Sequence, residues 1–380
     1  MRPQELYKAF SACGIDYYVG VPDSLLQHFC AFLVHTVPAE HHVICANEGN
    51  AIGVAIGRYL ATGTPAVVYM QNSGLGNVVN PVTSVADAQV SGIPMVFVVG
   101  WRGEMLIDGS QMHDEPQHVK MGQVTEDLLT VIGVRYITVD TNTLNIAEAV
   151  KDLVVHTRKH SQPVALLVRK NTFEATHQLS APASTATLSR EDAIEALLQA
   201  LPPTVPIVST TGMASRELFE LRVKRGEGHA RDFLTVGAMG HASQIATGVA
   251  SAYKSTVVCL DGDGSVLMHM GVLALNARQK NLLHVLINNG AHDSVGGQPT
   301  AGLHVDFCAI AKACGYADAR RVDTAKDLQS VIADWQNFSG AVLLEVHCKT
   351  GSRSDLGRPT TTPTANKNSF MEFLHDREND

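Results

Sequence analysis

The sequence lacks features that mark several large classes of protein: a long apolar run, a block of basic residues and a cysteine pair at C-x-x-C spacing. Without an apolar run of membrane-spanning length, a bilayer protein is not expected. Formal net charge is -8, with both signs mixed along the chain, which argues against nucleic acid or anionic lipid as a partner. Residues 1–24 have no apolar core of the kind found in a signal peptide. We therefore expect a soluble, cytoplasmic protein whose partners are small molecules or a second copy of the chain.

The cysteines fit the same compartment. Their number is odd and most lie in apolar runs, so we predict buried thiols of a cytosolic protein. They are Cys13, Cys30, Cys45, Cys259, Cys308, Cys314 and Cys348.

Short β-rich runs alternate with helical patterns along both halves of the chain. Runs that are apolar throughout and separated by helices are typical of parallel sheets covered on both faces. One intervening segment, residues 49–63, has no polar face and is predicted to be a buried helix. The predicted strands are residues 17–21, 42–45, 65–70, 94–100 and 164–168 in the first half, and 207–210, 256–260, 282–287 and 342–346 in the second.

The chain length of 380 residues suggests two or three domains, at roughly 100–200 residues for each domain. Residues 174–188 are rich in Ala, Ser, Thr and Pro without apolar periodicity, so we predict a linker. Ser189 then caps a predicted helix over residues 190–201. The predicted fold class is α/β, with one domain over residues 1–173 and a second over residues 189–380, each a mainly parallel sheet covered by helices.

Asp263 lies between two glycines after an apolar strand, in the stretch 261-DGDGSVLMHM-270. A glycine-rich turn between a strand and a helix presents backbone N–H groups and the positive end of the helix dipole to a phosphate. Gly262 and Gly264 allow the backbone to approach closely. A carboxylate would repel a diphosphate unless a divalent cation lay between them, and Mg²⁺ is held by one or two carboxylates plus phosphate oxygens. The alternative is an ordinary turn-forming Asp-Gly pair.

Asn288 and Asn289 come at the end of the next predicted strand. Asn289 can offer an amide oxygen to the same ion, and the carbonyl of Ala291 is within reach of it. The asparagines alone would suggest a loop cap, but two polar strand ends at the carboxyl edge of a parallel sheet predict one ligand site. The patterns G-x-x-x-x-G-K-[ST] and G-x-G-x-x-G of two other diphosphate-binding folds are absent. We therefore predict a diphosphate held through Mg²⁺, with Mn²⁺ or Ca²⁺ as alternatives.

The GDG motif followed by paired asparagines resembles the signature of the thiamine diphosphate enzymes. The resemblance extends to the first half, where 46-ANEGNAIGVAIGRYLATG-63 is similar to the pyrimidine-binding site of that superfamily and places Glu48 at the position of its activating glutamate. It implies a pyrimidine-binding domain followed by a diphosphate-binding domain, with thiamine diphosphate and Mg²⁺ as cofactors. Glu48 has an alternative explanation, because the helix dipole favours a glutamate in the first turn.

Glycines recur every four residues after Glu48, at Gly49, Gly53 and Gly57, although each one costs helix propensity. A stripe without side chains suits the close approach of another backbone. Because this superfamily builds its sites at a subunit interface, the resemblance implies a homo-oligomer, at least a dimer.

Further cofactor-binding residues follow from the resemblance. The segment 235-TVGAMGHASQIATGVA-250 is similar to the one that grips the aminopyrimidine, which implies a hydrogen bond to the Gly237 carbonyl and a wedge formed by Met239. Ordinary core packing is the alternative for Met239. The residues implied at the diphosphate and the metal are Thr211, Gly212, Gly262, Asp263, Gly264, Ser265 and Asn289, with Asp263, Asn289 and Ala291 as metal ligands.

Within the superfamily, residues 113–118, 289–300 and 351–363 resemble the phosphonopyruvate decarboxylases, with the sulfopyruvate decarboxylases as near relatives. The resemblance covers nearly the whole chain. It implies decarboxylation of 3-phosphonopyruvate to phosphonoacetaldehyde and CO₂ in phosphonate biosynthesis, with the cofactor accepting the electron pair.

The adjacent-histidine motif of the larger pyruvate decarboxylases is absent from the active-site loop, so another group must transfer the proton. The candidates are Asp23, His113 and His118, which lie in or near loops after predicted strands and are of types suited to acid–base work. Asp23 also matches the position of an active-site aspartate in related decarboxylases.

A substrate with a second anionic group needs a binder. Arg353 and Arg358 could hold a phosphonate by forked, charge-assisted contacts, although two arginines in a surface loop are common. Ser294 and Gln298 are the second candidates.

Three alternatives to this function remain open at the level of sequence. The chain could decarboxylate sulfopyruvate or another 2-oxo acid, or it could be a carboligase that passes the product carbon to an aldehyde. It could also be a binding subunit without activity, although the presence of Glu48, Asp263 and Asn289 on one chain argues against this.

Overall fold

The computed structural model describes residues 1–175 and 185–378. The chain forms two compact units, unit 1 over Met1–Ser180 and unit 2 over Ala181–Asp380. The division falls inside the predicted linker, most of which lies outside the described residues. In the part of the chain that the structure describes, no helix combines the length and the apolar character that crossing a bilayer requires.

Unit 1 is built around a six-stranded parallel sheet in the order β2-β1-β3-β4-β6-β5. Its strands are β1 (Tyr18–Gly20), β2 (His42–Ile44), β3 (Ala66–Gln71), β4 (Met95–Gly100), β5 (Arg135–Val139) and β6 (Val164–Val168). Its helices are α1 (Pro3–Ala12), α2 (Gln27–Thr36), α3 (Glu48–Thr62), α4 (Leu75–Pro81), α5 (Pro116–Val131) and α6 (Ile146–His160).

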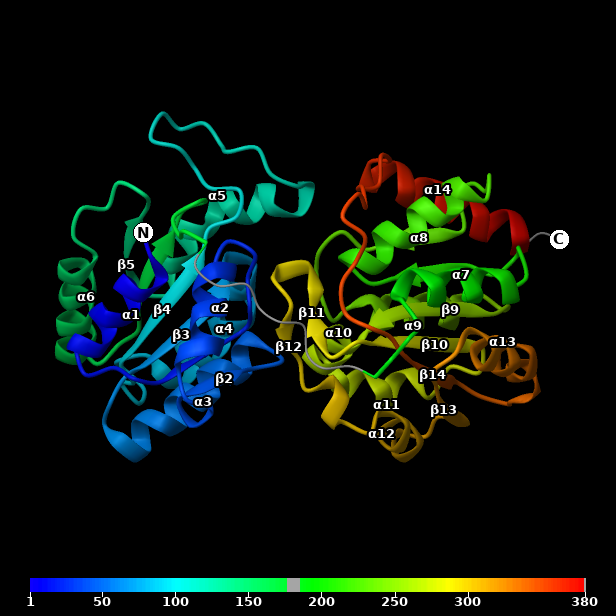
Figure 1. The fold of residues 1–380 in the computed structure, drawn as a ribbon, viewed down its shortest axis with the longest axis horizontal. Coiled ribbons are helices and arrows are strands. Elements are labelled where there is room, and N and C mark those ends of the chain that lie inside the picture. The colour runs from blue at the N-terminus through cyan, green and yellow to red at the C-terminus, as the bar shows by residue number, and fades with distance from the viewer. Residues whose placement is uncertain (176–184, 379–380) are drawn as a thin grey trace. The chain divides into compact units, whose positions relative to one another are not determined.

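Both faces of this sheet are covered (Figure 1). Alternate residues of β3 enter two separate apolar cores, Val67 and Tyr69 in one and Val68 and Met70 in the other. Because successive side chains of a strand point to opposite faces, a strand that is apolar at every position must be buried on both sides.

Unit 2 repeats the plan with a parallel sheet in the order β13-β14-β10-β9-β7-β8. Its strands are β7 (Ile207–Ser209), β8 (Asp232–Leu234), β9 (Val257–Gly262), β10 (Leu282–Asn288), β13 (Asp318–Val322) and β14 (Val342–His347), and a small antiparallel pair is formed by β11 (Ala291–His292) and β12 (Gln298–Pro299). Its helices are α7 (Arg190–Ala200), α8 (Met213–Lys224), α9 (Ala242–Ala252), α10 (Asp263–Met268), α11 (Leu273–Asn276), α12 (Phe307–Cys314), α13 (Ala325–Asp334) and α14 (Pro363–Glu378).

The central strand β9 is again divided between two cores. Val258 and Leu260 pack with residues of α7, α8 and α13, whereas Val257 and Cys259 pack with residues of α9 and α12. The predicted helix after Ser189 is α7, and the Ser189 side chain accepts a hydrogen bond from the Asp192 N–H. Two parallel sheets flanked by helices confirm the predicted fold class.

Three strands of these sheets were not predicted, namely β5, β8 and β13, and all three lie at the edge of a sheet. Arg135–Val139 and Asp318–Val322 each contain arginine and are only partly buried, and Asp232–Leu234 has three residues. An edge strand is covered on fewer sides than a central one, so it need not be a continuous apolar run.

The prediction that residues 49–63 form a buried helix is wrong for one side of that helix. Residues 48–62 are helical, and Glu48, Ala51, Ile52 and Ala55 are buried. The opposite side, however, exposes Gly53, Val54, Gly57 and Leu60.

The prediction that the cysteines are buried thiols is confirmed for four of the seven. All seven thiols are free, but Cys13, Cys308 and Cys314 are only half-buried, and the other four are buried.

Candidate active site

The carboxyl ends of three neighbouring strands meet at one edge of the unit 2 sheet. Strands β7, β9 and β10 are parallel and adjacent, so the loops after Ser209, Gly262 and Asn288 lie together. A cavity opens among these loops. Of the residues predicted to bind cofactor, metal or substrate, those that line it are Thr211, Met239, Gly262, Asp263, Gly264, Ser265, Asn289, Ala291 and Ser294.

Asp263 is the first residue of α10 and is 3% exposed. Its carboxylate accepts hydrogen bonds from the Thr300 hydroxyl and from backbone N–H groups, including those of Asn289 and Gly264. Burial raises the pKa of Asp263 to about 6 despite these bonds. Among the described residues no cationic side chain is paired with it. A buried carboxylate in this state gains stability from a cation.

The two adjacent asparagines have different surroundings. Asn288 is fully buried and its amide nitrogen donates to the Gly302 carbonyl and to Glu345. It therefore links the end of β10 to neighbouring segments and does not line the cavity. Asn289 lines the cavity, donates its amide nitrogen to Asp293, and accepts the Ala291 N–H on its Oδ1 atom at 3.1 Å.

Ser265 ties the cavity loops together. Its hydroxyl oxygen lies 3.1 Å from the Thr210 hydroxyl, which donates to it, and it accepts the Gly240 N–H at 3.1 Å. The second bond anchors the loop that carries Met239. Gly212 and Gly237, also predicted at the cofactor, do not line the cavity themselves; Gly212 lies between the lining residues Thr211 and Met213, and Gly237 is two residues before Met239.

The donor atoms at this cavity fit a hard divalent cation. The carboxylate of Asp263, the amide oxygen of Asn289 and the carbonyl of Ala291 are all oxygens, which Mg²⁺ and Ca²⁺ prefer. The backbone at Gly264 also leaves little room, since a Cβ atom there would lie 3.1 Å from the end of Met239 and 3.0 Å from the His292 ring. The residues present therefore fit a metal-bound diphosphate.

Sequence reasoning missed several residues at this cavity. His292 is buried in its wall, and burial lowers the pKa of its ring to about 4, so the ring is neutral at physiological pH. Arg190, at the start of α7, lines the cavity from the other side. No local pattern marked Arg190, because the strand ends and the first residue of α7 come together only in the folded chain.

Asp261, the first acid of the DGDG motif, also lines the cavity, and its side chain is completely buried. Its Oδ1 atom accepts the Gly262 N–H at 2.9 Å, and its Oδ2 atom lies 3.6 Å from Nε2 of His284. Nδ1 of His284 lies 3.2 Å from the Tyr316 hydroxyl. Cys259 completes this fully buried group. Asp261 therefore holds the backbone of the turn that precedes Asp263 through this bond to the Gly262 N–H.

The residues predicted to bind the substrate differ in their surroundings. Gln298 is completely buried, and neither polar atom of its amide has a partner, which is costly unless a ligand or water is bound. It is paired in the β11–β12 ladder with His292. Arg358 is exposed.

The contacts of Arg353 do not support the prediction that it binds the phosphonate of the substrate. It forms ion pairs with Glu191, Glu220 and Asp355. A guanidinium that already faces three carboxylates has little affinity left for a phosphonate, so the geometry does not support Arg353 as the anion binder.

Glu48, in unit 1, is the first residue of α3 and is 6% exposed. The Asn47 side chain caps the helix by accepting the Gly49 N–H, and Asn77 donates to Oε2 of Glu48 at 2.7 Å. A Cβ atom at Gly74 would lie 2.5 Å from Oε1 of Glu48, so this glycine makes room for the carboxylate. The Oε1 atom of Glu48 accepts no hydrogen bond from the described residues and is the oxygen available to a ligand.

A second acid follows the neighbouring strand. Asp23, after β1, is fully buried, and its Oδ2 atom accepts the Leu25 N–H at 3.1 Å while its Oδ1 atom has no partner. Burial raises the pKa of Asp23 to about 6, although the Arg102 charge opposes this. Arg102, after β4, is held by both oxygens of Asp114 at 2.7 and 2.5 Å.

Of the two predicted histidines, His118 belongs to this group and His113 does not. His118 is buried, and its pKa is lowered to about 4 by burial and then by the Arg102 charge. His113 is exposed. The structure thus brings Asp23 and His118 together around Arg102.

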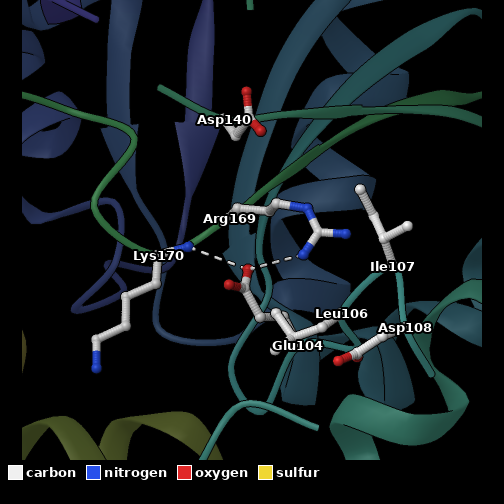
Figure 2. A pocket seen from close by; sticks show the side chains of 7 residues that line it. All are labelled: Glu104, Leu106, Ile107, Asp108, Asp140, Arg169 and Lys170. Atoms are coloured by element: carbon white, nitrogen blue, oxygen red, sulfur yellow. Dashed lines mark hydrogen bonds and ion pairs between the residues drawn. The ribbon is translucent and has the colours of Figure 1, made fainter. Parts of the chain in front are cut away.

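Another cavity of unit 1 contains none of the predicted site residues. It is lined by the loop residues Glu104, Leu106, Ile107 and Asp108 on one side and by Asp140, Arg169 and Lys170 on the other. Figure 2 shows Glu104 facing the Arg169 guanidinium and the backbone N–H of Lys170. Glu104 and Arg169 form an ion pair within it, and we assign the cavity no role.

Each half of the chain matches a known protein family. Residues 4–121 match the family described as thiamine pyrophosphate enzyme, N-terminal TPP binding domain, and residues 210–346 match the corresponding C-terminal TPP binding domain. The chain is 33% identical over 387 residues to the phosphonopyruvate decarboxylase of Streptomyces viridochromogenes, which covers 97% of this chain and 94% of that protein.

Two further relatives match over almost their whole length. A phosphonopyruvate decarboxylase of Streptomyces hygroscopicus is 33% identical, covering 97% of this chain and 93% of that protein. A sulfopyruvate decarboxylase of Methanosarcina acetivorans is 25% identical, covering 98% of each chain.

Proposed function

Because this chain belongs to the thiamine pyrophosphate enzymes and, within them, to the phosphonopyruvate decarboxylases, we propose that it converts 3-phosphonopyruvate to phosphonoacetaldehyde and CO₂ with thiamine diphosphate and Mg²⁺. The observation that carries the proposal is the cavity at the ends of β7, β9 and β10, where Asp263, Asn289 and Ala291 present oxygen atoms beside a glycine-rich turn. In this proposal these three residues hold Mg²⁺, and Thr211 and the backbone near Gly264 hold the diphosphate.

Thiamine diphosphate, when bound, supplies an acceptor for the electron pair that CO₂ leaves behind. Glu48 has the task of holding a proton at the aminopyrimidine ring. Its Oε2 atom is fixed by Asn77, so Oε1 is directed to one place rather than rotating freely. Met239 and the Gly237 carbonyl grip the same ring in the proposal.

Proton transfer to the product is assigned to Asp23, with His118 and His113 as the other candidates. Asp23 is supported by its unpartnered Oδ1 atom and by a pKa of about 6, which lets the carboxyl group both hold and release a proton near neutral pH. His292 adds a neutral imidazole to the cavity wall.

The phosphonate group of the substrate is assigned to Arg358, Ser294 and Gln298. The buried amide of Gln298 has both a donor and an acceptor without partners, and Ser294 lines the cavity. Sulfopyruvate differs from phosphonopyruvate by one charge at this group, and the methanogen relative keeps it as the second candidate substrate.

We propose further that the protein is a homo-oligomer with active sites at the subunit interface. The exposed side of α3 supports this, because a Cβ atom at Gly53 or Gly57 would meet nothing within 4 Å. These glycines lie on the exposed side of α3, opposite the buried Glu48, so a partner packed on them would contact the helix that begins at the activating carboxylate.

The proposal is tested by measuring CO₂ release from 3-phosphonopyruvate, sulfopyruvate and pyruvate with the purified protein, thiamine diphosphate and Mg²⁺, and by identifying the aldehyde formed. We expect phosphonopyruvate to be preferred, with activity lost on chelation of the metal and restored by Mg²⁺. Preference for sulfopyruvate would reassign the substrate. Absence of CO₂ release from all three substrates, with the cofactor bound, would contradict the decarboxylase.

A further inference from the structure

We propose that Asp293 is a positioning residue of the metal site, which fixes the orientation of the Asn289 amide, and that Arg190 acts through Asp293. The proposal rests on the proposed function, since it takes Asn289 as a metal ligand. Neither residue is part of the glycine-rich turn or of the paired asparagines that suggested the site.

A single oxygen atom of Asp293 receives three donors. Its Oδ2 atom accepts the Asn289 amide nitrogen at 2.7 Å, a terminal nitrogen of Arg190 at 2.8 Å and the Gly351 N–H at 3.0 Å. An asparagine amide can be turned by half a rotation with little change of shape, which would point N–H groups at a cation. The bond to Asp293 opposes this, because only the amide nitrogen can donate to a carboxylate, and it acts together with the Ala291 N–H that donates to the amide oxygen.

Arg190 makes this arrangement rigid. It is 6% exposed and forms a bidentate pair with Glu217 at 2.7 and 2.9 Å. Its other terminal nitrogen is left for Asp293, whereas the terminal nitrogen bound to Glu217 also donates to the Gly351 carbonyl. Because Arg190 opens α7 and Glu217 lies in α8, the orientation of the metal loop is set by two helices of the unit 2 core. Partners of this kind commonly change metal affinity by about 10–100-fold.

The alternative role for Asp293 is direct ligation of the metal. The Oδ2 atom, which already accepts three hydrogen bonds, has little capacity left for a cation, so direct ligation would fall to the Oδ1 atom. The two roles differ in their dependence on Asn289. A positioning residue acts only when Asn289 is present, whereas a ligand acts with or without it.

The experiment measures Mn²⁺ binding to the full chain with thiamine diphosphate, following the electron paramagnetic resonance signal of the free ion. Wild type is compared with Asp293→Ala, Asp293→Asn, Asn289→Ala and the double variant Asp293→Ala/Asn289→Ala. We expect Asp293→Ala to raise the Mn²⁺ Kd about 10-fold or more. Asp293→Asn, which keeps an oxygen acceptor, should raise it less. The double variant should bind as weakly as Asn289→Ala alone.

Arg190→Gln tests the second step, and its effect on the Mn²⁺ Kd should disappear in the Asp293→Ala background. Asp232→Asn is the matched control, because Asp232 is a buried carboxylate of the same unit paired at two atoms with Arg222, and it should leave the Mn²⁺ Kd of the folded protein unchanged.

Three results would overturn the inference. An unchanged Kd for folded Asp293→Ala would remove the positioning role, and additive effects in the double variant would make Asp293 a ligand itself. If wild type failed to bind Mn²⁺ with thiamine diphosphate, the metal site of the proposed function would fail first, and the inference with it.

Discussion

Three carboxylates at strand ends, Asp23, Glu48 and Asp263, are at most 6% exposed. Burying a charge is costly unless a partner compensates for it, and none of the three has an ion pair of its own among the described residues. Asp23 and Asp263 have pKa values raised by burial to about 6. At the scale of the residue, the protein therefore gives up stability to keep acids where a ligand would bind.

Glu48→Gln tests the role of one of them. Glutamine keeps the size of the side chain and can still contact Asn77, so thiamine diphosphate should bind within a few-fold of wild type. Turnover should fall about 100-fold or more, because proton transfer at the cofactor is lost. Steady-state CO₂ release and cofactor titration give the two quantities. Glu104→Gln, another buried glutamate of unit 1 at 4% exposure, is the control and should keep its activity.

Asp23→Asn is expected to raise the free energy of unfolding at pH 8 and to lose this advantage in acid. The pKa of Asp23 is 3.8 without the fold and about 6 within it. The folded state thus binds the proton more tightly, and wild-type stability falls as the pH rises from about 4 to about 6. The difference between the two pKa values corresponds to about 3 kcal/mol. Urea unfolding of both proteins at pH 4.5 and 8 measures it, and an equal advantage at both would mean that charge burial is not the cause.

At the scale of the element, the site depends on short loops that bring backbone close to side chains. The loop after β12 returns to α10, where Thr300 donates to Asp263 and the Gly302 carbonyl accepts from Asn288. These contacts join the ends of β9 and β10 through a third segment, which no motif in the sequence connects to them.

Gly302→Ala should disturb this junction. A Cβ atom there would lie 2.8 Å from Oδ1 of Asn288 and 2.8 Å from Cβ of Asp263, which is closer than carbon and oxygen atoms pack. The metal Kd should rise about 10-fold, by the magnitude typical of lost partners around a metal ligand. Gly271→Ala is the control, since a Cβ atom there meets nothing within 4 Å. Metal titration of both variants decides it, and equal affinities would show that the loop yields without cost.

At the scale of the whole molecule, the outer side of α3 is left uncovered within the chain. Glycine is unfavourable in a helix by about 1 kcal/mol at each position relative to alanine, and Gly53 and Gly57 gain nothing within the chain to offset it. Val54 and Leu60, at 37% and 71% exposure, lie on the same helix. A second copy of the chain is the covering that the proposed function requires.

Gly53→Arg should shift the protein toward monomer and reduce turnover in parallel, because a long charged side chain would fill the space that a partner backbone needs. Val155→Arg is the control, since Val155 is a 57% exposed apolar residue on α6. Sedimentation velocity of both variants gives the oligomeric state. Unchanged assembly of Gly53→Arg would place the interface elsewhere.

Local patterns in the sequence were sufficient to predict the parallel α/β architecture and the glycine-rich turn that lines the unit 2 cavity. Apolar strands, the Ser189 cap and the GDG and paired-asparagine motifs are local patterns, and each reports a local constraint on backbone or burial. Three further facts became known only from the tertiary structure. Asn289, and not Asn288, faces the cavity. Arg353 is paired with Glu191 and Glu220, and Asp293 links the Asn289 amide to Arg190. These facts depend on which side chains meet across distant segments, and hydrogen-bond and ion-pair partners brought together by the sheet leave no trace in the spacing of residues along the chain.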